Sequence, residues 1–198
     1  MSKHSKPSRP GHTNDANRIR IIGGVWRSRV IDFPASESLR PTPNRVRETL
    51  FNWLGQTLHG RRCLDLFSGS GALGFEAASR GAEKVVMVEK EGQVQKALRK
   101  NRETLAATNC HLFAGNADAF LDQNREKFDV IFLDPPFASD SLAPVLKRIH
   151  QHLSPDGVVY VEWGDPFSAI AGECDWQTIK QGKAGVVHFG LLSTKGAT

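Results

Sequence analysis

The sequence predicts an α/β domain whose core is a seven-stranded, mostly parallel sheet with helices on both faces. Short apolar runs alternate with helical segments from Gly60 onward, a pattern typical of βαβ units and parallel sheets. The segment from Trp176 to Leu192 holds two strands with no room for a helix between them, so these strands are predicted to pair antiparallel. Two β-prone runs around Gly23 and Gly24 predict an N-terminal β-hairpin. With 198 residues and no internal repeat, the chain suits a single domain with a small appendage.

The N-terminal segment differs in composition from the rest. Residues 1–17 are rich in Ser, Pro, Lys, Asn and Gly and contain few apolar side chains, so they cannot offset their own ordering entropy. They are predicted to form a disordered arm ahead of a domain over residues 18–198. The predicted hairpin occupies residues 18–34 (RIRIIGGVWRSRVIDFP) and carries arginines on its strands.

The positive charge is concentrated at this end of the chain. Residues 1–29 contain seven Lys and Arg residues against Asp15 alone, a net charge of +6, whereas the whole chain carries +5. The remainder is therefore close to neutral. Because Lys and Arg displace counterions from nucleic acid, the arm fits a phosphate backbone. A solvated, solubilising tail is the alternative.

A helix is predicted within RPTPNRVRETLFNWLGQTL, residues 40–58. Thr42 is a candidate N-cap with Pro43 at the first helical position. Arg45 and Arg47 lie off the apolar stripe. The apolar residues at helical spacing are Val46, Leu50, Trp53, Leu54 and Leu58.

The alternating region supplies the other elements. Its predicted strands are CLDLF (63–67), KVVMVE (84–89), HLFAG (111–115), FDVIFLD (128–134) and GVVYVEW (157–163). Its predicted helices run from Ala72 to Arg80, from about Gly92 to Leu105, near Asp118 to Asn124 and near Ser141 to His152.

A glycine-rich loop follows the first of these strands. DLFSGSGALG, residues 65–74, has the GxGxxG spacing between a strand and a helix, where glycines let a ligand approach the backbone and free N–H groups. Glu89 ends the next strand, where a carboxylate can accept hydrogen bonds from adenosine ribose hydroxyls. Asp65 would repel the pyrophosphate of a dinucleotide but suits the ammonium group of S-adenosylmethionine. A tight turn without a ligand is the alternative.

The tetrapeptide DPPF follows a strongly apolar strand, at the carboxyl edge where ligands of open α/β folds bind. An amino group on a planar ring is a poor nucleophile. The Asp134 carboxylate and the Pro135 carbonyl can each accept one of its N–H bonds and direct its lone pair at a methyl donor. Pro136 rigidifies the turn, and Phe137 offers a stacking face for a base. No separate catalytic base is required, because Asp134 can relay the proton to water.

Taken together, DLFSGSGALGFEAASRGA, VEK, GNA and DPPF, preceded by RPTPNRVRETLFNWL, resemble the RsmD family of class I S-adenosylmethionine-dependent methyltransferases over about residues 18–192. The resemblance implies a Rossmann-like fold. It also implies methyl transfer to the N2 amine of a guanine in small-subunit (16S) ribosomal RNA.

The resemblance also assigns residues. It implies that Asp65 and the loop residues Ser68, Gly69, Ser70 and Gly71 hold the methionine portion of the cofactor, Glu89 with Lys90 the ribose, and Asn116 with Ala117 the adenine. Many class I members have Asp where this chain has Asn116, so either Asn116 or Asp118 makes the adenine contact. The expected RNA-binding residues are Arg18, Arg20, Arg27 and Arg29, with Arg40 and Thr42 of the RPT element closing over cofactor or substrate.

Other features of the sequence bear on localisation, metal binding and the rival functions. The chain has no signal-peptide pattern and no apolar run long enough to span a bilayer, and its scattered Cys and His residues suggest no disulfide or metal site. We expect a cytoplasmic monomer that binds ribosomal RNA or a small-subunit particle. Four rivals stay open: a glutamine-amide methyltransferase, which usually has NPPY; an adenine-N6 DNA methyltransferase; an NAD-dependent dehydrogenase; and a non-catalytic RNA-binding protein.

Overall fold

The structure is a computed structural model that describes residues 17–35, 39, 41–135, 142–163 and 176–194. Its strands are β1 (Arg18–Arg20), β2 (Val30–Asp32), β3 (Arg62–Asp65), β4 (Lys84–Glu89), β5 (Cys110–Ala114), β6 (Phe128–Leu133), β7 (Leu153–Trp163), β8 (Trp176–Ala184) and β9 (Val187–Thr194). Its helices are α1 (Asn44–Trp53), α2 (Ala72–Ser79), α3 (Gly92–Thr104), α4 (Ala117–Gln123), α5 (Leu142–Ile149) and the 3-10 turn η2 (His150–His152). None of these helices is long and apolar enough to cross a membrane.

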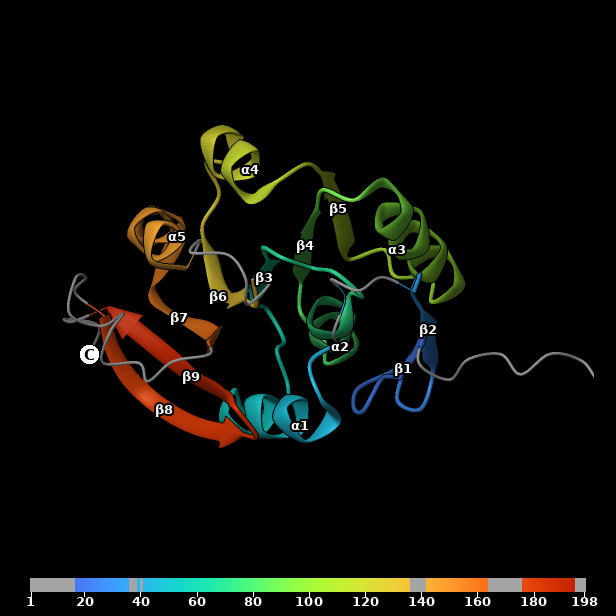
Figure 1. Ribbon diagram of the computed structural model, residues 1–198, viewed down its shortest axis with the longest axis horizontal. Helices are drawn as coiled ribbons and strands as arrows, with labels where there is room; N and C mark the ends of the chain where they lie inside the picture. The colour runs from blue at the N-terminus through green and yellow to red at the C-terminus, as the bar shows by residue number, and fades with distance from the viewer. Residues whose placement is uncertain (1–16, 36–38, 40, 136–141, 164–175, 195–198) are drawn as a thin grey trace, which may run out of the picture.

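Seven strands form one sheet in the order β5-β4-β3-β6-β7-β9-β8 (Figure 1). The five strands from β5 to β7 are parallel, and β9 pairs antiparallel with both β7 and β8. The predicted fold class is therefore confirmed. In the chain, β3 is followed by β4 on one side of it and later by β6 on its other side. A ligand site is therefore expected at the carboxyl ends of β3 and β6.

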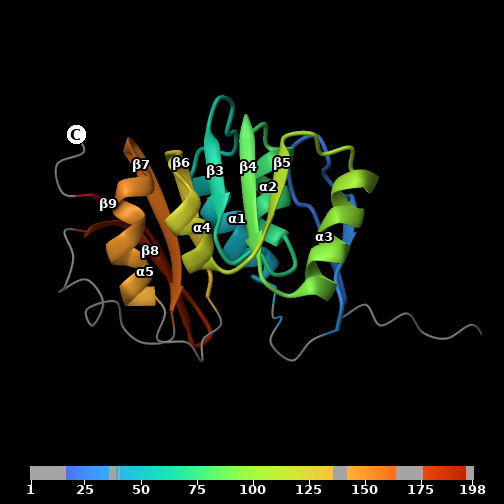
Figure 2. The ribbon, with the colours of Figure 1, turned by 90° about the horizontal axis from the view of Figure 1, so that it is seen from above.

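Alternate residues of each strand pack into two separate cores. One core joins the sheet to α1, α2, α3 and the N-terminal hairpin, through residues such as Cys63, Met87 and Phe132. The other joins it to α4 and α5, through Leu64 and Ile131. Figure 2 shows α4 and α5 on the opposite side of the sheet from α1 and α2. The alternation follows from the two-residue period of a strand.

The predicted N-terminal hairpin is present, with β1 antiparallel to β2. Its connection is longer than a tight turn at Gly23 and Gly24, because it is bonded to α2. The Val25 amide donates to the Ser79 carbonyl, and a Cβ on Gly24 would lie 1.8 Å from that oxygen. The glycine is therefore required by the close approach of two backbones.

The two expectations for the start of α1, Thr42 as its N-cap and Pro43 as its first helical residue, were wrong. Thr42 does not cap the helix: the N-cap residue is Pro43 and has no side-chain cap bond, while the Thr42 hydroxyl donates to Asp134 at 3.0 Å. Arg47 lies off the apolar stripe but is only 1% exposed, because its guanidinium pairs with buried Glu76 of α2. In both cases the side chain binds a residue that is distant in the sequence: Thr42 binds Asp134, and Arg47 binds Glu76.

Candidate active site

Four carboxylates share one face of the sheet at the carboxyl ends of neighbouring strands. Asp65 ends β3 and Glu89 ends β4, while Asp134 directly follows β6 and Glu162 lies near the end of β7. Each acid lies two residues beyond a core residue of its own strand, and residues two apart on a strand point to the same face. These core residues, which pack toward α1 and α2, are Cys63, Met87, Phe132 and Tyr160. We call the four carboxylate residues the acidic row.

The glycine loop between β3 and α2 has the backbone that its sequence predicts. Gly69 and Gly71 have positive φ angles of 47° and 81°, a region that favours glycine. At Gly74 a Cβ would lie 2.9 Å from Met87 Cγ and 3.0 Å from Asp65 Oδ2. Gly74 thus allows α2 to pack close to the sheet while its amide reaches Asp65.

Glu89 is held in place by the loop that it faces. Its two oxygens accept hydrogen bonds from the Gly69 amide at 2.9 Å and the Glu91 amide at 2.8 Å. A carboxylate has about four lone-pair positions, so each oxygen can still accept a hydroxyl. The arrangement fits a ribose with two adjacent hydroxyl groups.

Asp65 is a buried carboxyl whose surroundings favour a cationic ligand. It is 2% exposed, and its Oδ2 accepts from the Gly74 amide at 2.9 Å. Burial raises its pKa from 3.8 to about 7, the Gly74 hydrogen bond opposes this rise, and the charges of Asp134 and Glu89 add to it. An ammonium group beside Asp65 would offset that burial cost, so the residues fit the methionine end of S-adenosylmethionine.

This raised pKa predicts an unusual dependence of stability on pH. Because folded Asp65 binds its proton more tightly than unfolded Asp65, its contribution to stability is full below about pH 4 and is lost as pH rises to about 7. Calorimetry of the cofactor-free protein should show that Asp65→Asn loses less thermal stability than wild type between pH 4.5 and 7.5. Equal losses in the two proteins would contradict the assignment.

Asp134 is half-buried at the end of β6, and Pro135 beside it is buried. Burial raises the pKa of Asp134 to about 6, and the hydrogen bond from Thr42 opposes that rise. At neutral pH the carboxylate is therefore largely ionised and can accept an N–H bond. Pro136 and Phe137, the other predicted catalytic residues, lie outside the described residues.

The family described as Conserved hypothetical protein 95 matches residues 19–193. Ribosomal RNA small subunit methyltransferase D of Escherichia coli is 38% identical over 185 residues, 92% of this chain and 93% of the relative. The chain belongs to this family. The Haemophilus influenzae protein of the same name is 40% identical over 184 residues, 90% of this chain and 95% of the relative. A solved Escherichia coli structure, 38% identical, covers 89% of this chain and 98% of its own, with a TM-score of 0.81.

The RsmD family resemblance is thereby confirmed, together with the Rossmann-like methyltransferase fold. In this family member Leu39 lies against the glycine loop, and Thr42 reaches the end of β6. A Cβ on Gly69 would lie 2.9 Å from Leu39 Cδ2, and Thr42 contacts Asp134. Arg40 lies outside the described residues.

The remaining predicted residues occupy distinct positions. Ser68 and Ser70 are buried within the loop, and Lys90 is exposed after β4. The Asn116 side chain caps α4 by accepting from the Ala119 amide at 2.8 Å. Asp118 pairs with Arg148 of α5. The four hairpin arginines are exposed: Arg18, Arg20, Arg27 and Arg29.

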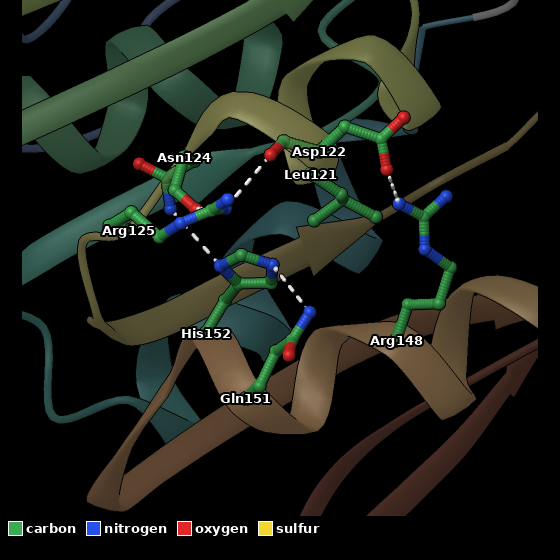
Figure 3. A pocket seen from close by; sticks show the side chains of 7 residues that line it. All are labelled: Leu121, Asp122, Asn124, Arg125, Arg148, Gln151 and His152. Atoms are coloured by element: carbon green, nitrogen blue, oxygen red, sulfur yellow. Dashed lines mark hydrogen bonds and ion pairs between the residues drawn. The ribbon is translucent and has the colours of Figure 1, made fainter.

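A polar pocket of about 350 Å³ lies away from this site, between α4 and η2 (Figure 3). It is lined by Leu121, Asp122, Asn124, Arg125, Arg148, Gln151 and His152. Arg148 is paired with both Asp118 and Asp122, so its charge is already neutralised. Within the described ranges, no group of three or more His, Cys, Asp or Glu side chains could hold a metal ion.

Sequence reasoning missed one member of the acidic row. Glu162 is 4% exposed, and its Oε1 accepts from the Tyr160 hydroxyl at 2.7 Å. The signal was present, because the acid in YVEW follows an apolar strand just as Glu89 does in MVEK. Only the strand order makes it a neighbour of Asp134.

Proposed function

We propose that this protein transfers a methyl group from S-adenosylmethionine to the exocyclic N2 amine of a guanine in small-subunit ribosomal RNA. One observation carries the proposal: Asp134 of the DPPF tetrapeptide shares a face and an edge of the sheet with Asp65, Glu89 and the glycine loop. The names of the relatives, ribosomal RNA small subunit methyltransferase D, support RNA as the substrate.

The cofactor would be held by the chain's own donors and acceptors. Asp65 would bind the ammonium group, the backbone around Gly69 and Gly71 the carboxylate end, and Glu89 the ribose hydroxyls. Lys90, exposed beyond Glu89, would border the ribose. When bound, S-adenosylmethionine supplies an electrophilic methyl carbon.

Asn116 and Ala117 are the proposed neighbours of the adenine. The Gly115 amide donates to the Glu89 backbone carbonyl at 2.9 Å. This bond brings Asn116 close to Glu89, whose carboxylate is the proposed ribose-binding group. Asp118 instead directs its carboxylate toward Arg148 on α5. We therefore assign the adenine contact to Asn116 rather than Asp118.

Asp134 and Pro135 would perform the chemistry at the target nitrogen. The carboxylate and the prolyl carbonyl accept the two N–H bonds, so the lone pair points away from both. The negative charge of Asp134 stabilises positive charge that develops on nitrogen, and its carboxylate takes up the departing proton and passes it to water. Pro136 would stiffen the turn, and Phe137 would stack on the extruded base.

RNA is proposed to bind through the basic N-terminal region, with the protein acting as a monomer in the cytoplasm. The hairpin that carries the exposed arginines is bonded to α2 through the Val25 amide and the Ser79 carbonyl, and to α3 through the Arg29 side chain, which donates to the Thr104 carbonyl. Residues 1–16, which hold most of the predicted arm, lie outside the described residues. The arm contributes Lys3, Lys6 and Arg9.

Deletion of residues 1–17 is expected to weaken RNA binding and flatten its salt dependence. Loss of three phosphate contacts would reduce the slope of log K against log salt by up to about 2. Titration of labelled RNA at several salt concentrations measures this slope, and unchanged cofactor affinity serves as the control. An unchanged slope would assign the arm to solubility.

The function is tested by incubating the protein with labelled S-adenosylmethionine and ribosomal RNA from cells that lack it. Naked RNA and small-subunit particles are separate substrates in this assay. Nucleoside mass spectrometry should identify N2-methylguanosine. Methylation of adenine N6, of a protein glutamine, or no transfer at all would each overturn the proposal.

A further inference from the structure

Glu162 and Asp134 lie next to each other on adjacent parallel strands. The register pairs Phe132 with Tyr160 and Leu133 with Val161, so Asp134, the next residue after Leu133, falls level with Glu162. Both side chains point to the face that carries α1, since each lies two residues beyond a member of that core. The strand pairing therefore brings two carboxyl groups together.

Thr42 lies beside both groups but has one hydroxyl proton. Its hydroxyl donates to Asp134 Oδ2 at 3.0 Å, and it is close enough to the Glu162 carboxyl to affect the pKa of that group. A hydroxyl can donate only once and must otherwise accept. When Thr42 donates to Asp134, Glu162 can complete the chain only by carrying a proton of its own.

We propose that Glu162 is a positioning residue that carries the single proton of an Asp134–Glu162 pair, and that it thereby keeps Asp134 ionised and Thr42 directed at it. This role rests on the proposed methyl transfer at Asp134. The order of donors is Tyr160 hydroxyl to Glu162, Glu162 to Thr42, and Thr42 to Asp134. The chain ends on the carboxylate that grips the substrate amine.

The groups around Glu162 favour this distribution of charge. Asp134 faces it from β6, Tyr160 from its own strand, and Thr42 from the segment before α1; on β9 its partner in register is Phe189. None of these neighbouring groups carries a positive charge. Burial raises its pKa to about 8, and the charge of Asp134 adds to that rise. The hydrogen bonds that the Tyr160 and Thr42 hydroxyls can donate to the ionised form of Glu162 oppose the rise.

The pairing has a consequence for the proton released in the reaction. Glu162 already holds a proton and cannot take another, so the proton that leaves the amine binds the Asp134 carboxylate and then passes to water. If Glu162 loses its proton at high pH, Thr42 is shared between two anions and Asp134 is no longer held in one orientation. We expect the turnover rate to fall at that point.

The test compares wild type with Glu162→Gln, a near-isosteric variant that mimics the protonated acid. Glu103→Gln, exposed on α3, is the matched control. The infrared titration uses cofactor-free proteins that all carry Asp65→Asn, because the Asp65 carboxyl itself loses its proton near pH 7. A protonated carboxyl band should disappear near pH 8 in the protein with Glu162 and in the control, and should be missing in Glu162→Gln. Tyr160→Phe should shift this titration to higher pH, because a donor to the ionised acid is lost.

Turnover on ribosomal RNA gives the second measurement. The wild-type rate should fall above about pH 8, whereas the Glu162→Gln rate should stay level to pH 9. Glu162→Ala should lower kcat by about 10- to 100-fold with an unchanged cofactor KM, because Asp134 loses its orientation. A carboxyl band that still titrates near pH 8 in Glu162→Gln, or the same alkaline fall in both enzymes, would overturn the pairing. Absence of RNA methylation by wild type would overturn the proposed function instead, and the infrared titration would still decide whether Glu162 is protonated.

Discussion

Replacement of Asp134 with alanine is expected to lower the rate of methyl transfer by about 10³-fold, because the substrate amine loses the anion that orients it and stabilises its developing charge. Cofactor affinity should change little, since the residues proposed to bind S-adenosylmethionine are Asp65, Glu89 and the glycine loop. Single-turnover assays on ribosomal RNA measure the first quantity, and isothermal titration calorimetry measures the second.

Asp129→Asn is the matched control for this variant. Asp129 lies at the opposite end of β6, where its carboxylate accepts from the Arg62 amide at 2.8 Å, far from the carboxyl edge. Its replacement should leave the rate of transfer unchanged. If Asp134→Ala weakened cofactor binding as much as it slowed turnover, Asp134 would belong to the cofactor site and not to the target nitrogen.

Glu76→Gln is expected to lower the free energy of unfolding by about 3–5 kcal/mol, because it leaves the buried Arg47 guanidinium without its counterion. Glu76 is fully buried and accepts from four donors: the amides of Ile22 and Gly23 at 2.8 Å, Arg47 Nη1 at 3.4 Å and Arg80 Nε at 2.8 Å. One side chain thus joins the hairpin, α1 and α2.

Urea unfolding followed by circular dichroism measures this loss. Glu103→Gln, an exposed substitution of the same chemistry, should change the free energy of unfolding by less than about 0.5 kcal/mol. The hairpin carries the proposed RNA-binding arginines, so Glu76→Gln should also weaken RNA binding more than cofactor binding. A loss no larger than that of the control would mean that Arg47 finds another partner.

The elements of the sheet could be predicted from the sequence because their signals are local. The alternation of apolar strands and helices, the glycines at 69, 71 and 74, and the final strand pair each depend on residues close together in the chain. The positions of Asp65, Glu89 and Asp134 at strand ends follow in the same way. Their proposed roles remain predictions for the experiments above.

Interactions between distant segments were decided only by the tertiary structure. Thr42 has the sequence context of a helix cap, yet the fold places Asp134 within reach of its hydroxyl. Arg47 is buried because α2 presents Glu76 to it.

Sequence alone therefore determined the elements of this protein, the glycine loop and three of the four acids, because each depends on a pattern of a few neighbouring residues. The strand order alone made Glu162 the neighbour of Asp134, since two residues 28 positions apart meet only when β6 and β7 pair in register. Burial and charge at such a contact depend on both partners, and no local pattern contains both.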